Sequence, residues 1–468
     1  MSYDALFEPI TIGNMELKNR IAVAPMNVGY AAPDGYPNDQ YLAFYATRAR
    51  GGYGLIITTA AMVNPYDWAG SEGMNPLKFT DYRYYRFWSE IIKAVHYYDG
   101  CKIAIQLSPG WGRQGHPNVG KPGVPSGAPS CVPLCMDLRD YFKKCKGNLK
   151  QMSKKVPAGT FESMDLDGLI NMSDQEYFST DFQQFLQDFL SQMDPEIYSF
   201  IWGDVPRELT IPEITDLEDR MAVQARDALN LGFDAVEIHS PHGYLIHQFL
   251  SPKMNKRKDE YGGSLQNRAR FLMNIIRKIR KKVGPDKPVW CRLSGDELQP
   301  GGIHHDEQCL VAAMAKEAGV NAINVSQGSY EAMGSAFAPD GEGDFTRWAA
   351  GFKKATGGLP IMVPHFLTPA RAEKAIKNES VDIIELGRQS LADPFWPVKV
   401  KTGREKEIIK CTRCQQCYIE FGAKHFLECA VNPVTGREKY FPELWLNDTT
   451  FGNRLNKAIK KMSGFPQI

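Results

Sequence analysis

A complete strand–helix–strand unit lies between residues 234 and 293: the strand Asp234-Ala-Val-Glu-Ile-His239, the helix Ser264–Val283 and the strand Val289-Trp-Cys-Arg-Leu293. Within the helix, apolar side chains recur on one face, at Phe271, Leu272, Ile275, Ile276 and Ile279. Both strands are nearly continuous apolar runs, which is typical of parallel strands buried on both faces. The unit therefore predicts an α/β protein with a parallel sheet.

The same alternation of strand and helix extends over most of the chain. The predicted strands are Arg20–Met26, Leu55–Thr59, Lys102–Leu107, Asp234–His239, Val289–Leu293, Ala322–Ser326, Ile361–Pro364 and Ile383–Gly387. Eight such units indicate a (β/α)8 TIM barrel, with a doubly wound sheet as the alternative. The barrel accounts better for the number of units.

Two stretches interrupt the alternation. About seventy residues, from roughly Ser130 to Trp202, are inserted after the third strand. They contain apolar residues at helical spacing: Phe178, Phe182, Phe185, Leu186, Phe189 and Leu190. We predict a barrel over residues 1–405, including this insertion, and a cysteine-containing segment with a polar tail over residues 406–468. The insertion is expected near the mouth of the barrel, as a lid, a docking surface or a surface addition without a role.

Composition excludes several classes of protein. The 468 residues carry 55 basic and 54 acidic side chains, a net charge of +1, which argues against a nucleic-acid or anionic-membrane surface. There is no run of 18 apolar residues, and Met1-Ser2-Tyr3-Asp4 does not begin a signal peptide, so we expect a cytoplasmic protein. Ten cysteines in such a protein indicate metal binding or redox chemistry rather than disulfides.

The strongest local motif is Cys411-x2-Cys414-x2-Cys417-x11-Cys429. Four cysteines can surround one metal centre, because a tight loop gathers the first three and a later residue completes the site. Structural zinc and iron–sulfur clusters both use four cysteines, so the spacing alone leaves both open. Three closely spaced cysteines and a distant fourth favour a [4Fe–4S] cluster.

A second group of polar residues, His239-Ser-Pro-His242-Gly-Tyr244, ends the fourth strand. Barrel enzymes build their active sites at this end of the strands, so these side chains are candidates for catalysis. Two histidines three residues apart can donate hydrogen bonds to one carbonyl oxygen and polarise it. Tyr244 offers a weakly acidic hydroxyl for proton delivery.

These motifs belong to a longer ordered series that resembles the Old Yellow Enzyme superfamily, within it the branch of 2,4-dienoyl-CoA reductase and trimethylamine dehydrogenase. The series runs from about Leu6 to Pro433, apart from the insertion. Its segments are Leu17-Lys-Asn-Arg-Ile-Ala-Val-Ala-Pro-Met26, Ala104-Ile-Gln106-Leu107, His239–Pro252, Asn255–Arg268, Leu386-Gly387-Arg388 and the four cysteines. Such a series is far more specific than any single motif.

The resemblance implies a barrel that binds FMN. The positions that match flavin-lining residues of the family are Pro25, Met26, Asn27, Thr59, Ala60, Gln106 and Arg292. A cation such as Arg292 would stabilise the negative charge of reduced flavin. Gly387 and Arg388 match the phosphate-binding position, in agreement with the usual phosphate site of barrels near strands seven and eight.

Two positions and the C-terminal end of the sequence depart from the family pattern. His365 follows the seventh strand where many relatives carry glycine, although its ring could itself donate to a phosphate. Tyr330 stands where dienoyl-CoA reductases carry a histidine that assists proton transfer, so a second acid is expected there. Relatives with this cluster continue into two nucleotide-binding domains, whereas this sequence ends at Ile468 without a G-x-G-x-x-G strand–helix unit. We therefore expect a separate electron-donor protein at the cluster, or NAD(P)H acting directly at the FMN.

The resemblance and the motifs together predict an ene-reductase. Electrons would reach FMN through the [4Fe–4S] cluster, and hydride would pass from FMN N5 to the β-carbon of an α,β-unsaturated carbonyl compound: an enoate, an enoyl-CoA or a cyclic or steroid-like enone. His239 and His242 would hold the carbonyl, and Tyr244 would protonate the α-carbon. One alternative is an amine or alkene-forming dehydrogenase that passes electrons out through the cluster. The other is a zinc-stabilised barrel without catalytic activity. The substrate and the oligomeric state, a homo-oligomer included, are not determined by the sequence.

Overall fold

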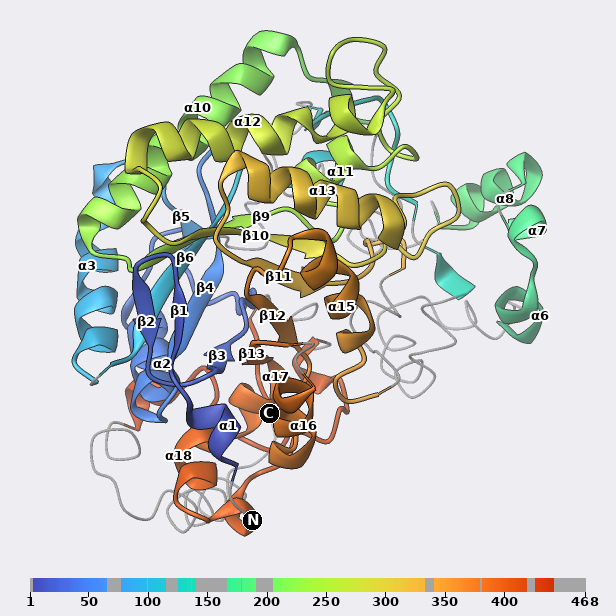
Figure 1. Ribbon diagram of the computed structural model, residues 1–468. Coiled ribbons are helices and arrows are strands. Elements are labelled where there is room, and N and C mark those ends of the chain that lie inside the picture. The colour runs from blue at the N-terminus through green and yellow to red at the C-terminus, as the bar shows by residue number, and fades with distance from the viewer. Residues whose placement is uncertain are drawn as a thin grey trace.

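Eight parallel strands form a closed barrel in the computed structural model (Figure 1). The described residues are 3–64, 77–98, 100–114, 125–135, 137–139, 166–177, 179–190, 205–332, 341–378, 381–418 and 426–441. In chain order the barrel strands are β3 (Ile21–Val23), β4 (Leu55–Met62), β6 (Lys102–Ser108), β9 (Ala235–His239), β10 (Val289–Ser294), β11 (Ile323–Ser326), β12 (Ile361–Pro364) and β13 (Ile383–Leu386). The barrel closes because β3 pairs with β13 on one side and with β4 on the other. The predicted (β/α)8 barrel is confirmed.

Helices surround the barrel on the outside. They are α2 (Asp39–Arg50), α3 (Tyr82–His96), α10 (Ile211–Leu231), α12 (Leu265–Val283), α13 (His305–Ala318), α15 (Thr346–Ala355), α16 (Pro369–Lys377) and α18 (Trp396–Lys401). The predicted helix is α12, which begins after Ser264, whose side chain accepts a hydrogen bond from the Asn267 amide. Its five predicted apolar residues are all buried, so this face provides the packing against the barrel.

Short elements complete the chain. A hairpin of β1 (Ile10–Ile12) and β2 (Met15–Leu17) precedes the barrel, and its apolar side chains join the cluster that fills the end where the strands begin. The carboxyl ends of the strands, which carry the polar residues, therefore lie at the other opening of the barrel. The remaining short elements are α1 (Asp4–Phe7), β5 (Leu77–Lys78), η3 (Gly112–Gln114), β7 (Gly127–Ala128), β8 (Arg207–Glu208), α11 (Leu245–Leu250), α17 (Arg388–Ala392), η5 (Glu405–Glu407) and η6 (Glu438–Tyr440).

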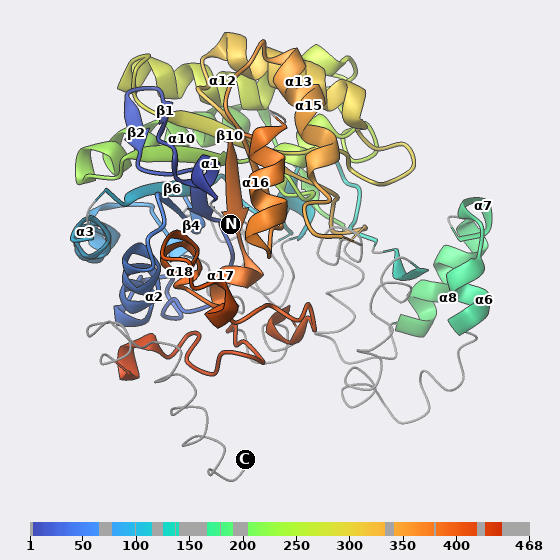
Figure 2. The same cartoon turned by 60° about the horizontal axis from the view of Figure 1, so that its bottom comes forward.

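The described part of the insertion forms three helices that stand to one side of the barrel (Figures 1 and 2). These are α6 (Leu166–Asn171), α7 (Asp174–Tyr177) and α8 (Thr180–Leu190). The predicted helix is α8, in which Leu186 is buried whereas Phe185 is 57% exposed. The side chains of Phe178, Phe189 and Leu190 lie outside the described residues.

The segment that carries the four cysteines packs against the barrel near α2 and α17 (Figure 2). The Tyr30 hydroxyl donates to the Leu427 carbonyl over 2.7 Å, and Asn432 donates to the Leu391 carbonyl over 2.7 Å. Arg48 of α2 forms an ion pair with Glu438 at 3.2 Å. The contacts of Tyr30 and Arg48 join residues almost 400 positions apart, the Asn432 contact joins residues 41 positions apart, and together they hold the segment to the barrel.

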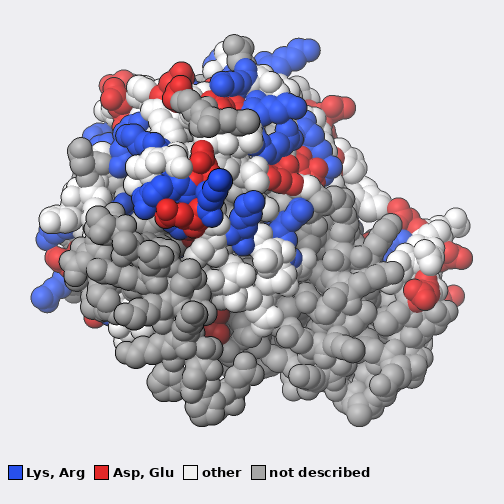
Figure 3. Space-filling view, turned by 90° about the horizontal axis from the view of Figure 1, so that it is seen from below, with Lys and Arg blue, Asp and Glu red and all other residues white. Residues whose placement is uncertain are grey.

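Charged side chains of both signs share the surface seen in Figure 3, where Lys and Arg lie interspersed with Asp and Glu over the described residues. This distribution agrees with the near-zero net charge of the sequence. Among the helices of the described ranges, none combines the length and the hydropathy needed to cross a membrane.

Candidate active site

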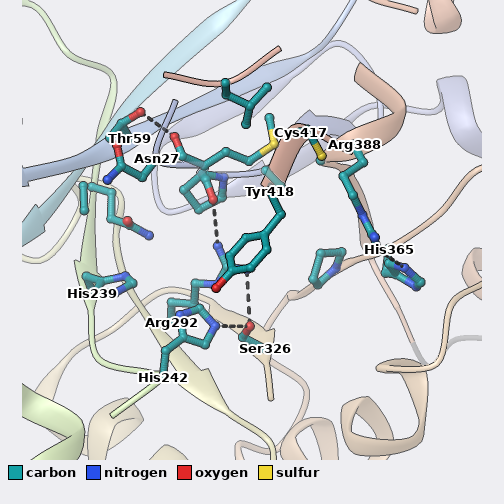
Figure 4. A pocket seen from close by; sticks show the side chains of 18 of the residues that line it. Asn27, Thr59, His239, His242, Arg292, Ser326, His365, Arg388, Cys417 and Tyr418 are labelled. Atoms are coloured by element: carbon teal, nitrogen blue, oxygen red, sulfur yellow. Dashed lines mark hydrogen bonds between the residues drawn. The ribbon is translucent and has the colours of Figure 1, made fainter. Parts of the chain in front are cut away.

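A cavity of about 290 Å³ opens at the ends of the barrel strands (Figure 4). All fourteen residues predicted to act in catalysis or FMN binding line it: Pro25, Met26, Asn27, Thr59, Ala60, Gln106, His239, His242, Tyr244, Arg292, Tyr330, His365, Gly387 and Arg388. They come from all eight barrel strands or the loops that follow them. The sequence-based site is therefore gathered in one place, as the location of active sites in barrels predicts.

His239 and His242 both line the cavity but differ in their hydrogen bonds. His242 has a positive φ of 66°, its amide donates to the Ser294 hydroxyl over 3.2 Å, and its Nε2 lies 2.6 Å from the Ser326 hydroxyl. The Nδ1 atom of His239 is buried without a hydrogen-bond partner among the described residues. An unpartnered buried nitrogen of this kind is free to bond a ligand.

The electrostatic surroundings keep both imidazoles neutral. Burial, followed by the charge of Arg292, lowers the pKa of His239 to about 3 and holds the pKa of His242 well below its usual 6.5. A neutral imidazole carries one N–H, so each ring can donate one hydrogen bond without being a strong acid. This pair can polarise a carbonyl group.

Two tyrosine hydroxyls lie next to each other in the site. The hydroxyls of Tyr244 and Tyr330 lie 2.8 Å apart, and Trp111 packs edge-on against the Tyr244 ring with centroids 4.9 Å apart. Burial, and then the neighbouring Tyr330, raises the pKa of Tyr244 well above 10, and burial raises the pKa of Tyr330. Both hydroxyls therefore stay protonated at neutral pH, and Tyr330 stands beside Tyr244 as the sequence comparison suggested.

Arg292 places a buried positive charge beside the histidines. Its guanidinium makes two long hydrogen bonds, each of 3.4 Å, to the Pro25 carbonyl and the Ser326 hydroxyl. Its Nε atom has no partner within the described residues. A buried cation with spare donors fits a ligand edge that carries carbonyl oxygens or negative charge, as the pyrimidine edge of a flavin does.

A second cation lies at the other side of the cavity, across from His239 (Figure 4). Arg388 follows β13, and its guanidinium lies 2.7 Å from Nε2 of His365. Burial, and then Arg388, lowers the pKa of His365 to about 3, so the neutral ring accepts the hydrogen bond from Arg388. Arg388 is thus held in place at the position expected for a phosphate group.

The four cysteines of the C-terminal motif approach the same cavity. Cys417 lines it together with Gln415 and Tyr418 (Figure 4). Burial, opposed by Arg388, raises the pKa of Cys417 to about 12, and interactions with Cys411, Cys429 and Cys414 add to the increase. Cys417 therefore lies within electrostatic reach of each of the other three thiols. Within the described ranges, no three His, Cys, Asp or Glu side chains converge as ligands of one metal ion.

Ser326 is a lining residue that the sequence did not single out. Its hydroxyl contacts both His242, at 2.6 Å, and Arg292, at 3.4 Å, so it connects the histidines with the buried cation. The available signal was its position as the last residue of a predicted barrel strand, where side chains point into the active site. Trp111, Phe345 and Tyr418 also line the cavity and were not predicted.

The sequence and fold of this chain are similar to those of several known proteins over most of its length. An "NADH oxidase" of Thermoanaerobacter brockii is 34% identical over 94% of this chain and 57% of its own length. A "Cinnamate reductase" of Clostridium sporogenes is 31% identical over 94% of this chain and 59% of its own. A solved complex of 2-naphthoyl-CoA reductase with 2-naphthoyl-CoA superposes with a TM-score of 0.74 at 27% identity, over 95% of this chain and 59% of that one. The chain thus spans less than two thirds of each of these relatives.

The model of the NADH:flavin oxidoreductase / NADH oxidase family matches residues 5–134 and 188–407. These ranges include every predicted catalytic and FMN-binding residue and omit residues 135–187, most of the insertion. The match covers well over half of the sequence and agrees with the predicted membership of the Old Yellow Enzyme superfamily. The chain belongs to the NADH:flavin oxidoreductase / NADH oxidase family.

Proposed function

We propose that the chain is an FMN- and [4Fe–4S]-dependent ene-reductase that reduces the C=C bond of an α,β-unsaturated carbonyl compound. The observation that carries this proposal is the grouping of two neutral histidines with a protonated tyrosine pair in one cavity. Reduction of a conjugated alkene requires polarisation of a carbonyl and delivery of one proton, and these side chains are suited to both tasks. The names of two relatives, a cinnamate reductase and a 2-naphthoyl-CoA reductase, support the same reaction class.

FMN is the cofactor that membership of this family implies, and the residues of the cavity suit it. Arg292 and Arg388 provide cations at two separated places, one for the pyrimidine edge and one for the phosphate. When bound, FMN supplies two-electron chemistry at N5, which no amino-acid side chain can provide. Gln106, Thr59 and Pro25 line the same cavity, the Pro25 carbonyl accepts a hydrogen bond from Arg292, and the three residues would orient the ring.

The chain's own residues then have distinct tasks. His239 and His242 donate hydrogen bonds to the carbonyl oxygen of the substrate and stabilise negative charge that develops there. Tyr244 supplies the proton to the α-carbon, and Tyr330 orients that hydroxyl through the 2.8 Å contact. The flanking ring of Trp111 excludes water from the same region.

We also propose that Cys411, Cys414, Cys417 and Cys429 bind a [4Fe–4S] cluster within a separate segment, residues 406–468. In such a cluster each thiolate binds a different iron, so the four sulfur atoms need not converge on one point as they do around zinc. The electrostatic interaction of Cys417 with each of the other three thiols supports this choice. A separate electron-donor protein or NAD(P)H would be the source of electrons.

The test is the cofactor content and reactivity of anaerobically purified protein. We expect about one FMN and about four irons per chain, and oxidation of the reduced flavin by a conjugated enone or enoate. FMN without iron would contradict the cluster and leave the reductase. Flavin bleaching by an amine, without an added reductant, would instead indicate the dehydrogenase direction. Protein with neither cofactor would contradict the catalytic proposal altogether.

A further inference from the structure

A layer of buried polar side chains lies inside the barrel beneath the cavity. It contains one side chain from each of five strands: Gln106 of β6, Glu237 of β9, Trp290 of β10, Asn324 of β11 and Glu385 of β13. All five are at most 2% exposed. Only Gln106 also lines the cavity. Two carboxyl groups in so enclosed a layer require an explanation, because burying an unpaired charge is costly.

Glu237 accepts three hydrogen bonds. Its Oε2 receives Trp290 Nε1 at 2.5 Å and Asn324 Nδ2 at 2.6 Å, and its Oε1 receives Gln106 Nε2 at 2.5 Å. The indole of Trp290 can only donate, so Oε2 must be an acceptor. Burial raises the pKa of Glu237, and Arg292 and the three hydrogen bonds oppose that shift. Three donors around one carboxyl group favour its ionised form.

Glu385 has fewer hydrogen-bond donors around it than Glu237. It accepts one hydrogen bond, from Asn324 Nδ2 at 2.6 Å, and its Oε2 has no partner among the described residues. Burial raises the pKa of Glu385 to about 8, with Arg292 opposing the shift and Glu237 adding to it. Two carboxyl groups on one amide nitrogen cannot both be ionised cheaply, so the proton belongs on the group with fewer donors.

We propose that Glu237 is a positioning residue that turns the amide of Gln106 so that its oxygen faces the cavity, while Glu385 holds the proton of the carboxyl pair. An ionised carboxylate accepts only, and it therefore binds the amide nitrogen of Gln106 and leaves the amide oxygen for a ligand. The pyrimidine edge of a flavin carries one N–H between two carbonyl groups. The amide oxygen of Gln106 could accept from that N–H, and the guanidinium of Arg292 could donate to a carbonyl group. The inference concerns FMN binding and does not depend on which alkene is reduced.

The substitution Glu237→Gln tests the positioning role. Trp290 and Asn324 would hold the new amide oxygen at the Oε2 position, so the new NH₂ group would face Gln106 and force that side chain to reverse. The cavity would then present a donor where the wild type presents an acceptor. We expect the dissociation constant of FMN to rise about tenfold or more, the effect of one mismatched buried hydrogen bond. The measurement is titration of deflavinated protein with FMN.

Two further variants separate positioning from a general structural effect. Glu385→Gln resembles a protonated carboxyl group and should change FMN affinity at pH 7 by less than about twofold. Gln106→Leu removes the amide that Glu237 positions, so adding Glu237→Gln to it should cause no further loss. Equal affinity of Glu237→Gln and wild type, or additive losses in the double variant, would overturn the proposal. Far-UV circular dichroism of each apoprotein excludes failure to fold.

The proton on Glu385 can be tested without any cofactor. The charged groups that act on it are Arg292 and Glu237. The Cys291 thiol, whose pKa burial raises, interacts with Glu237. Since the pKa of Glu385 is about 8 when folded against a usual 4.5, the folded state binds the extra proton between these values. This contribution to stability is complete below about pH 4.5 and is lost as the pH rises to about 8. The Tm of the Glu385→Gln apoprotein minus the Tm of the wild-type apoprotein should therefore increase as the pH rises from about 4.5 to about 8. A constant difference would contradict the assignment.

Discussion

Replacing Tyr244 with phenylalanine is expected to lower kcat for reduction of a conjugated alkene by about 10²–10⁴-fold, the usual contribution of a positioned general acid. The substitution removes the hydroxyl that lies 2.8 Å from Tyr330 and keeps the ring that packs against Trp111. Because the carbonyl-binding histidines are unchanged, KM should change little. The appropriate measurement is the rate at which the alkene reoxidises anaerobically reduced protein, since this step contains the protonation.

Two related substitutions show whether the effect belongs to Tyr244 itself. Tyr330→Phe leaves the Tyr244 hydroxyl in place and removes only its partner, so we expect a decrease of about tenfold. Tyr97→Phe alters a side chain that is 82% exposed and should have no effect. If Tyr244→Phe reduces the alkene at the wild-type rate, Tyr244 is not the acid. If Tyr330→Phe causes the larger loss, the two tyrosines have exchanged roles.

The barrel could be predicted because its strands are apolar on both faces. Each of the eight predicted strands is present, and β12 has the predicted bounds. The ends are less predictable: residues Arg20–Met26 were expected to be extended, whereas β3 covers only Ile21–Val23. Hydrophobicity continues beyond the last paired residue here, because the end of the strand contributes to the cavity rather than to the sheet.

The common location of His239, His242 and Tyr244 could be predicted because they lie within six residues at one strand end. The contact between Tyr244 and Tyr330 joins two loops 86 positions apart, and only the family resemblance pointed to it. The carboxyl pair of Glu237 and Glu385 was not predicted. These residues lie on strands far apart in the sequence, and each occurs within an apolar run that gives no sign of a polar partner.

The buried ion pair of Arg48 and Glu438 leads to the second large expected effect. The side chains are 0% and 4% exposed and lie 3.2 Å apart, and Arg48 also donates to the Phe44 and Ser390 carbonyls. Replacing Arg48 with methionine leaves the Glu438 carboxyl group buried without its cation. We expect the free energy of unfolding to fall by about 3–5 kcal/mol, as for other broken buried pairs. Denaturant unfolding monitored by tryptophan fluorescence measures this change.

A compensating substitution distinguishes the effect of the buried charge of Glu438 from the loss of the packing of Arg48. Adding Glu438→Leu to Arg48→Met removes the buried carboxyl group that has lost its cation, so most of the lost stability should return, because apolar replacements of buried pairs are often neutral. Lys93→Met breaks the exposed pair of Lys93 and Glu90, in which the side chains are 68% and 53% exposed, and should cost less than about 1 kcal/mol. A double variant as unstable as Arg48→Met alone would mean that the packing of Arg48, rather than its charge, holds the cysteine segment on the barrel. If the charge is what matters, iron retention should follow stability across the three variants, since Glu438 and the cysteines belong to the same segment.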